Sequence, residues 1–296
     1  MFVPLRVISG YSFLHSGLTV EKIANSVSSV GYIGAGLADF NNLYGLPSFI
    51  EALEKTKKKF IVGLSALING YSLVIYCINE EGYRNLIKVS SLLSKQVDVS
   101  SYLKNSHSGL IGVLETNYGA FLEKLNSPSE LPKEVFKLSE LVDKFYLGLD
   151  IKSEGEIPFN NKIRDFAYKY TYETVAFPRI LYQKKNDAII LKILEAIDTG
   201  EKIEEKEEVG LQYFRPIKEY ESLYNKEELD LTEQILNLNE FNIHQKRGEI
   251  IKYPVSDAVD TLKHEVFNGL KAKGIADQAH IERCKYELET IIDMGY

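Results

Sequence analysis

Residues 72–95 read SLVIYCINEEGYRNLIKVSSLLSK and join a continuously apolar stretch to one with helical spacing. The apolar run Ser72–Ile78 predicts a strand buried on both faces, which is typical of parallel sheets. After a turn, Gly82–Lys95 has the apolar spacing of an amphipathic helix. A strand followed by a helix is the repeating unit of an α/β fold, so this stretch predicts that fold class.

The same order recurs through the first 180 residues or so. Short β-branched runs end in turn residues, and stretches with helical spacing separate them. Consecutive units of this kind favour a closed or nearly closed barrel, with a doubly wound open sheet as the alternative. The seven predicted strands are Val3–Ile8, Ile33–Ala38, Phe60–Ser65, Ser72–Ile78, Leu110–Leu114, Phe145–Ile151 and Thr174–Phe177.

The pattern changes after about residue 186. An apolar helical stretch, Asp187–Thr199, is followed by the charged run Glu201–Glu208, which reads as a solvated loop. Asn225 and Glu228 have the spacing of a capping box, and further helical stretches extend to Met294. We therefore expect a barrel domain at 1–185 and a helical extension at 186–296.

Composition and charge limit the classes of function. Hydrophobic residues make up 45% of the 296 residues, enough for a full core. Cys77 and Cys284 are the two cysteines, which excludes a zinc site built on thiolates and leaves a disulfide framework unsupported. No apolar stretch approaches the roughly 18 residues of a membrane span. We expect a cytoplasmic protein with no membrane partner.

The negative charge is concentrated after the predicted barrel. Residues 201–240 hold five Lys and Arg against twelve Asp and Glu, a difference of −7 that equals the formal charge of the whole chain. Such a segment repels the phosphate backbone, so nucleic acid should not bind through it. At the carboxyl ends of the predicted strands, only Asp39 and Glu115 are potential metal ligands, with His15 in a nearby loop. They are too few for a site of two or three metal ions.

Four longer stretches carry a family resemblance, and the short stretch Ile61-Val-Gly63 resembles the pattern I-x-G of the same family. NEEGYRNLIKVSSL resembles the pattern N-E-E-G-Y-x-N-L-x-K-L-x-S, and the other stretches resemble the opening, an early loop and a later helix of the same family. Together they are similar to the N-terminal PHP (polymerase and histidinol phosphatase) region of the C-family bacterial replicative DNA polymerases, the DNA polymerase III alpha subunits. The stretches are Phe2–Leu14, Leu37–Gly45, Asn79–Leu92 and Tyr286–Tyr296.

The resemblance implies a distorted seven-stranded (βα) barrel with a cluster of metal ligands at its open end. Mapped onto this chain, only Asp39 keeps the family's residue. Ile and Leu cannot bind a metal, and Arg places a fixed positive charge where cations would lie. The resemblance thus implies a vacated metal-site cleft and no metal, formed by Arg6, Ile8, His15, Asp39, Phe40, Ser65, Ser72, Thr116, Arg179 and Leu181.

The family's catalytic P-D-x-D-x-D segment does not occur in this sequence. The resemblance therefore implies a fragment without cofactor or catalysis of its own, and Gly295-Tyr296 at the end also reads as a truncation. The parent chain would be a DNA-directed DNA polymerase, a nucleotidyltransferase that uses Mg²⁺. The fragment would be a scaffold that braces the remaining polymerase domains and docks a proofreading exonuclease, with DNA bound through the parent.

Two other classes of function stay open. The chain could be a metal-dependent PHP phosphoesterase or a 3′–5′ proofreading nuclease with an altered site. It could also be a binding module in which Arg6 and Arg179 contact an anion. An internal ion pair of these arginines with Asp39 is an equally good interpretation of the same residues.

Overall fold

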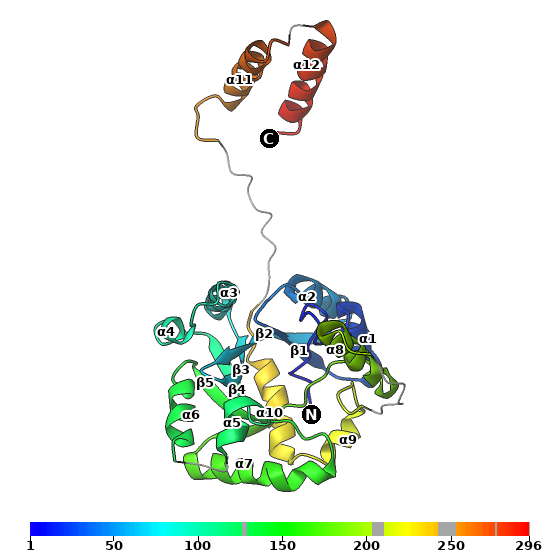
Figure 1. The fold of residues 1–296 in the computed structure, drawn as a ribbon, viewed down its shortest axis with the longest axis vertical. Coiled ribbons are helices and arrows are strands. Elements are labelled where there is room, and N and C mark those ends of the chain that lie inside the picture. Colours follow the sequence, from blue (N-terminus) through cyan, green and yellow to red (C-terminus); the bar gives the residue numbers. More distant parts are fainter. Residues whose placement is uncertain (126–128, 203–209, 242–252, 276, 296) are drawn as a thin grey trace. The chain divides into compact units, whose positions relative to one another are not determined.

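A computed structural model describes residues 1–125, 129–202, 210–241, 253–275 and 277–295 (Figure 1). Contacts within the chain divide it into two compact units, Met1–Asn242 and Ile243–Tyr296. The predicted domain boundary after residue 185 stays a prediction. Contacts alone extend the first unit to Asn242. In the described residues no helix is long and apolar enough to cross a membrane.

The first unit contains one curled sheet, so the α/β class is confirmed. Its six strands are hydrogen-bonded in chain order, from β1 to β6. The pairs β1–β2, β4–β5 and β5–β6 are parallel, as the sequence predicts. The strands are β1 (Gly34–Phe40), β2 (Lys59–Ile68), β3 (Tyr71–Cys77), β4 (Leu110–Glu115), β5 (Lys144–Leu149) and β6 (Glu173–Ala176).

The extended N-terminal segment lies between the two edges of this sheet. Val7 forms parallel bridges with Leu37 in β1 and with Ile180 after β6. Backbone hydrogen bonds support both contacts: Val7 N donates to Gly36 O (3.2 Å) and Ile8 N to Ile180 O (3.1 Å). The predicted strand at Val3–Ile8 is thus a segment with isolated bridges, and the count of seven strands is not confirmed.

The prediction of a parallel strand at Ser72–Ile78 is wrong, because β3 is antiparallel to both β2 and β4. The reason is a tight hairpin at Asn69 and Gly70, whose φ angles are +52° and +82°. Asn and Gly are the residues that adopt these left-handed angles most readily, and Asn-Gly between apolar runs is a strong hairpin signal. The hairpin also lengthens β2 to Ile68, beyond the predicted end at Ser65.

Helices surround the sheet and follow local signals in the sequence. In α3 the Asn79 side chain accepts a hydrogen bond from Gly82 N (2.8 Å) and so caps the helix. Gly82 lies so close to Gly109 that an added Cβ would be 2.0 Å from its carbonyl oxygen. The Asn-Glu-Glu-Gly stretch therefore starts a helix in tight packing. The helices of this unit are α1 (Val20–Val30), α2 (Leu46–Lys55), α3 (Glu80–Ser94), α4 (Ser100–Leu103), α5 (Gly119–Lys124), α6 (Leu131–Ser139), α7 (Ile157–Tyr170), α8 (Ile189–Thr199), α9 (Ile217–Glu221) and α10 (Lys226–Asn237), with 3-10 turns at Glu154–Glu156 and Lys185–Ala188.

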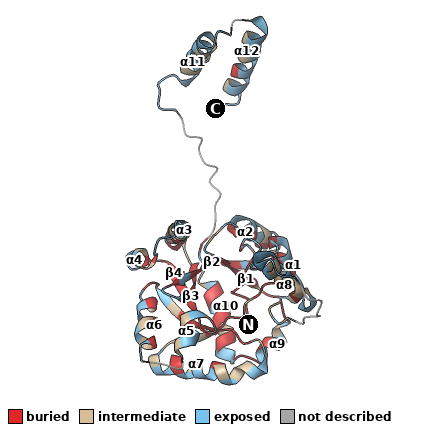
Figure 2. Cartoon of the chain, viewed as in Figure 1, coloured by how far each residue is buried: buried red, intermediate tan, exposed pale blue. Residues whose placement is uncertain are grey.

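Helix α10 packs into the core of the barrel (Figure 2). Leu231, Ile235 and Leu236 are buried against residues of the N-terminal segment and all six strands. The predicted capping box of Asn225 and Glu228 is confirmed. Glu228 also accepts hydrogen bonds from Arg164 Nε (2.7 Å) and Thr174 Oγ1 (2.9 Å), so one carboxylate ties α10 to α7 and β6.

The second unit has two described helices, α11 (Ala258–Ala272) and α12 (Gln278–Asp293). Asp257 and Asp277 cap them by accepting hydrogen bonds from Asp260 N and His280 N. Leu288 is the one buried hydrophobic residue among the described residues of this unit. The charged run predicted as a loop at Glu201–Glu208 lies mostly outside the described residues.

Truncating a buried side chain of α10 should make the first unit less stable. Ile235→Ala deletes a fully buried side chain and should lower the free energy of unfolding by about 2–5 kcal/mol, measured by urea denaturation. Gln234→Ala, at the exposed neighbouring position, is the control and should change it by less than about 0.5 kcal/mol. Equal effects of the two variants would contradict the placement of α10 in the core.

Candidate functional site

A buried ion-pair cluster lies at the mouth of the barrel, where the parallel strands end. Arg6, from the N-terminal segment, is 1% exposed, and its Nη2 contacts Oε1 of Glu115 at the end of β4. Its Nη1 lies 3.7 Å from Oδ2 of Asp150, the residue directly after β5. Arg179, which follows β6, has its Nη2 3.4 Å from Glu115 Oε2. Glu115 therefore contacts both arginines.

Tyr118 covers this cluster with its ring. The guanidinium carbon of Arg179 lies 4.0 Å from the ring centroid, and that of Arg6 lies 5.1 Å from it. The Tyr118 hydroxyl donates a hydrogen bond to Asp150 Oδ2 (2.7 Å). Burial raises the pKa of Tyr118 above its ordinary value, which keeps the hydroxyl a donor at neutral pH.

The four ionisable groups of the cluster balance in charge. Arg6 and Arg179 contribute two positive charges, and Glu115 and Asp150 contribute two negative ones. Burial, and then the charge of Arg6, lowers the pKa of Arg179 below its ordinary value. An arginine nevertheless stays charged at neutral pH. The mouth thus holds a neutral set of paired charges.

Asp39 belongs to a separate hydrogen-bond network. Its carboxylate accepts from Ser9 N, Ser9 Oγ and Ser12 Oγ, each at 2.7 Å. Burial raises the pKa of Asp39, and the hydrogen bonds from Ser9 and Ser12 oppose that shift. Within the described part of the chain, Arg6 and Arg179 form their ion pairs with Glu115 and Asp150. The interpretation that they pair with Asp39 is therefore wrong.

Three of the predicted cleft residues are apolar and pack together. Ile8 and Leu181 belong to a buried cluster against which Phe40 and Leu191 of α8 pack. The His15 ring packs against Phe40 in a tilted arrangement, with centroids 4.6 Å apart and an interplanar angle of 50°. These contacts make this side of the mouth an extension of the hydrophobic core.

The Ser and Thr residues of the predicted cleft lie outside the ion-pair cluster. Thr116 Oγ1 donates to Gly148 O (2.7 Å). Ser72 lies in β3 near the hairpin, opposite Leu67. Ser65 is buried, and its Oγ makes no hydrogen bond within the described residues. None of these three side chains joins the ion-pair cluster.

The residues at the mouth do not fit a resident metal. Among the described residues, no group of three or more His, Cys, Asp or Glu side chains is placed to hold one. Glu115 and Asp150, which could be ligands, face the Arg6 guanidinium. An arginine cannot bind a metal and repels cations.

Sequence reasoning missed Asp150 and Tyr118. The predicted strand at Phe145–Ile151 extends two residues beyond the end of β5 and so includes Asp150. A strand that ends at Leu149 places Asp150 at the mouth, where carboxyl ends of parallel strands meet. Tyr118 has no such signal, since its role depends on contacts across the barrel.

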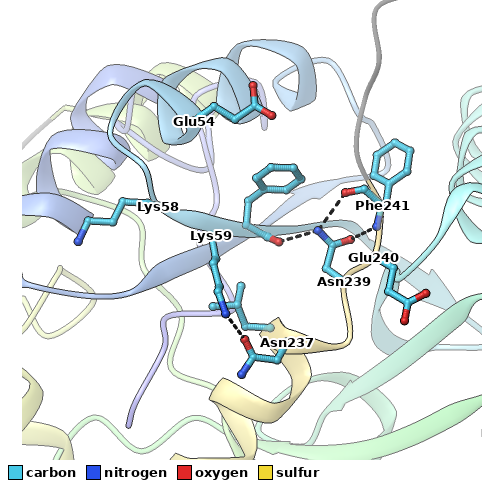
Figure 3. A pocket seen from close by; sticks show the side chains of 9 residues that line it. Glu54, Lys58, Lys59, Asn237, Asn239, Glu240 and Phe241 are labelled. Carbon is cyan, nitrogen blue, oxygen red and sulfur yellow. Dashed lines mark hydrogen bonds between the residues drawn. The ribbon is translucent and has the colours of Figure 1, made fainter.

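A pocket of about 350 Å³ lies elsewhere, where β2 begins and α10 ends (Figure 3). On its wall, Lys59 Nζ donates to Asn237 Oδ1 (2.7 Å), and Asn239 Nδ2 donates to Phe60 O (3.0 Å). Its ionisable residues are two Lys and two Glu, which balance in charge. The polar contacts join the end of α10 to β2, so they serve the fold.

Comparisons with known proteins found a matching family model, similar sequences and similar solved structures. The model of the PHP domain matches residues 4–153. The chain is 26% identical over 317 residues to a DNA polymerase III subunit alpha of Bacillus subtilis, and 27% identical over 342 residues to that of Rickettsia conorii. Each match covers 100% of this chain and 28% of the relative, so the chain spans about 28% of the length of these relatives. A solved amidohydrolase from Chromobacterium violaceum covers 61% of this chain and 88% of its own, with 10% identity and a TM-score of 0.40.

The raised pKa of Asp39 should make stability depend on pH. Because the folded state favours the protonated carboxyl, ionisation destabilises the fold as pH rises from about 4, the unfolded value, through the raised folded value. Asp39→Asn keeps the size of the side chain and one acceptor oxygen, but its amide does not ionise. We expect this variant to gain stability relative to the original chain between pH 4 and pH 7, measured by urea denaturation.

Asp39→Ala is the matched control for this pH dependence. It leaves the Ser9 and Ser12 donors without their acceptor and should lose about 1–3 kcal/mol relative to Asp39→Asn at either pH. A stability difference between the original chain and Asp39→Asn that stays constant from pH 4 to pH 7 would contradict the role of burial.

Proposed function

The chain belongs to the PHP domain family, and from this premise we propose that it is a non-catalytic scaffold of a DNA polymerase III alpha subunit. The family model covers residues 4–153, and the similarity to the alpha subunits extends over the whole chain. Its function is then to support DNA replication by bracing the polymerase domains of the parent protein.

The buried Arg6–Glu115 pair is the observation that carries this proposal. Metal-assisted hydrolysis needs several ligands and an open coordination position for water or substrate. At this mouth the carboxylates are engaged by arginines, and Ile8, Phe40 and Leu181 pack as core residues. This arrangement favours a degenerate metal site without turnover.

Contacts at the end of the first unit support a bracing role. The Phe241 ring stacks on Tyr83 of α3, with centroids 4.4 Å apart, and Glu240 N donates to Ile78 O (2.7 Å). Tyr83 belongs to the Asn79–Leu92 stretch that carries the family resemblance. We assign to this stretch the role of holding residues Glu240 and Phe241 at the end of the first unit.

The second unit needs a partner for its apolar residues. A pair of helices with one buried hydrophobic residue in its described part has too small a core to be stable alone. Val259, Phe267, Ile291 and Met294 are each more than a third exposed. The remaining domains of the parent polymerase are the proposed partner of this surface.

The rest of the assignment concerns the parent protein. As a DNA-directed DNA polymerase it would transfer nucleotides with Mg²⁺, bind DNA through its own domains, dock a proofreading exonuclease on the PHP region and act in the cytoplasm. The fragment itself would need no cofactor. A phosphoesterase or a 3′–5′ nuclease is the alternative. It is disfavoured because no group of three or more metal-ligand side chains lies together in the part of the chain that the structure describes. Anion binding by Arg6 and Arg179 is disfavoured because two carboxylates already neutralise them.

The isolated chain should show neither hydrolysis nor polymerisation. With Mn²⁺ or Zn²⁺ added, release of p-nitrophenol from its phosphate and shortening of a 3′-labelled primer should stay at the level without protein. Extension of a primed template should also be absent, while the intact alpha subunit extends it. Hydrolysis that depends on the metal, under conditions where an active PHP phosphoesterase works as the positive control, would refute the non-catalytic assignment.

The stack of Phe241 on Tyr83 should be measurable as an energetic coupling. Phe241→Ala and Tyr83→Ala should each lower the free energy of unfolding of the chain, and together they should cost about 0.5–1.5 kcal/mol less than the sum of the two. Tyr168→Ala, at a side chain that is 91% exposed, is the control and should change little. Additive effects in urea denaturation would contradict the proposed anchor.

A further inference from the structure

Arg6 connects three separate parts of the barrel. It lies on the N-terminal segment that closes the sheet, while its guanidinium reaches Glu115 at the end of β4 and Asp150 after β5. The backbone of this segment is bonded to both sheet edges: Gly36 N donates to Pro4 O (2.9 Å) and Ile180 N donates to Arg6 O (3.1 Å), besides the bridges at Val7. The backbone of the segment thus contacts the two edges, and the side chain of Arg6 adds a contact to β4 and to the end of β5.

The environment of Arg6 makes its charge costly to bury alone. Its side chain is 1% exposed, and those of Glu115 and Asp150 are 0% and 3% exposed. Arg6 Nε and Asp150 Oδ1 make no hydrogen bond within the described residues. Charged groups taken out of water need close opposite charges in compensation, and removing one partner leaves the other uncompensated.

Arg179 completes the balance of charges. It approaches the second oxygen of Glu115 from the side covered by Tyr118. With two arginines and two carboxylates the cluster is neutral, so an added divalent cation would bring an unpaired charge into a buried site. A phosphate ion would do the same with the opposite sign.

We propose that the guanidinium of Arg6 is the structural cation of the barrel mouth and makes the fold of this chain independent of metal. The charge of Arg6, rather than its volume, holds Glu115 and Asp150 and with them the closing segment. This inference concerns the residues of the barrel alone, and it would stand if the parent were not a polymerase.

A charge-restoring pair of variants of the 296-residue chain tests the proposal. Arg6→Met keeps most of the volume but leaves one carboxylate in excess, and should lower Tm by about 10 °C. The double variant Arg6→Met with Asp150→Asn is neutral again and should regain at least half of that loss. Asp150→Asn alone, which leaves one arginine in excess, should be less stable than the original chain.

Two results would overturn the proposal. One is an Arg6→Met chain whose Tm is within 2 °C of the original. The other is a double variant no more stable than Arg6→Met, since volume or shape would then explain the loss. If Arg6→Met does not fold, the double variant decides the matter: the proposal requires it to fold, and its failure to fold would refute the role of charge.

Added ions test the same proposal without mutation. The Tm of the original chain should change by less than 2 °C on treatment with EDTA and on addition of Mn²⁺, Zn²⁺ or inorganic phosphate. A rise of more than 5 °C with a divalent cation, or a fall of that size with EDTA, would show that a metal supports the fold. A rise of that size with phosphate would show an anion at the arginines, and either result would refute the neutral cluster.

Discussion

The pairing of Arg6 with Glu115 and Asp150 is the interaction on which the upper end of the barrel depends. The edge strands of the sheet are β1 and β6, and backbone hydrogen bonds join the N-terminal segment to β1 and to Ile180, which follows β6. An unpaired guanidinium at this depth would cost several kcal/mol, so the three side chains are stable only as a set. The position of the N-terminal segment and the compensation of buried charge therefore depend on the same side chains.

At the opposite end of the sheet, apolar burial takes the place of charge pairing. There α10 inserts Leu231, Ile235 and Leu236 among the inward side chains of the strands, and apolar burial is the driving force. Since α10 follows the last strand by about fifty residues, the core is complete only when this later part of the chain has folded back. The Phe241 stack on Tyr83 comes directly after, so the exit of the chain is fixed by the same step.

The sequence was informative where local pattern determines structure. Apolar runs predicted the strands, and the spacing of Asn225 and Glu228 predicted the start of α10. The direction of β3 was missed because a buried antiparallel strand has the same apolar run as a parallel one, although Asn69-Gly70 carried the hairpin signal. Strand ends and family motifs located Arg6, Asp39 and Arg179. Their partners depend on which side chains meet across the barrel, and spacing along the chain does not encode that.

The charged and the apolar residues at the mouth bear together on the proposed function. A buried arginine between carboxylates requires that no cation compete for them, and the packing of Ile8, Phe40 and Leu181 removes the polar surface that a hydrolytic water would need. Charge pairing and apolar packing together make the mouth part of the buried interior, in which Arg6 Nε and Asp150 Oδ1 make no hydrogen bond within the described residues. The proposed role as a brace rests on this buried mouth and on the contact of Phe241 with Tyr83.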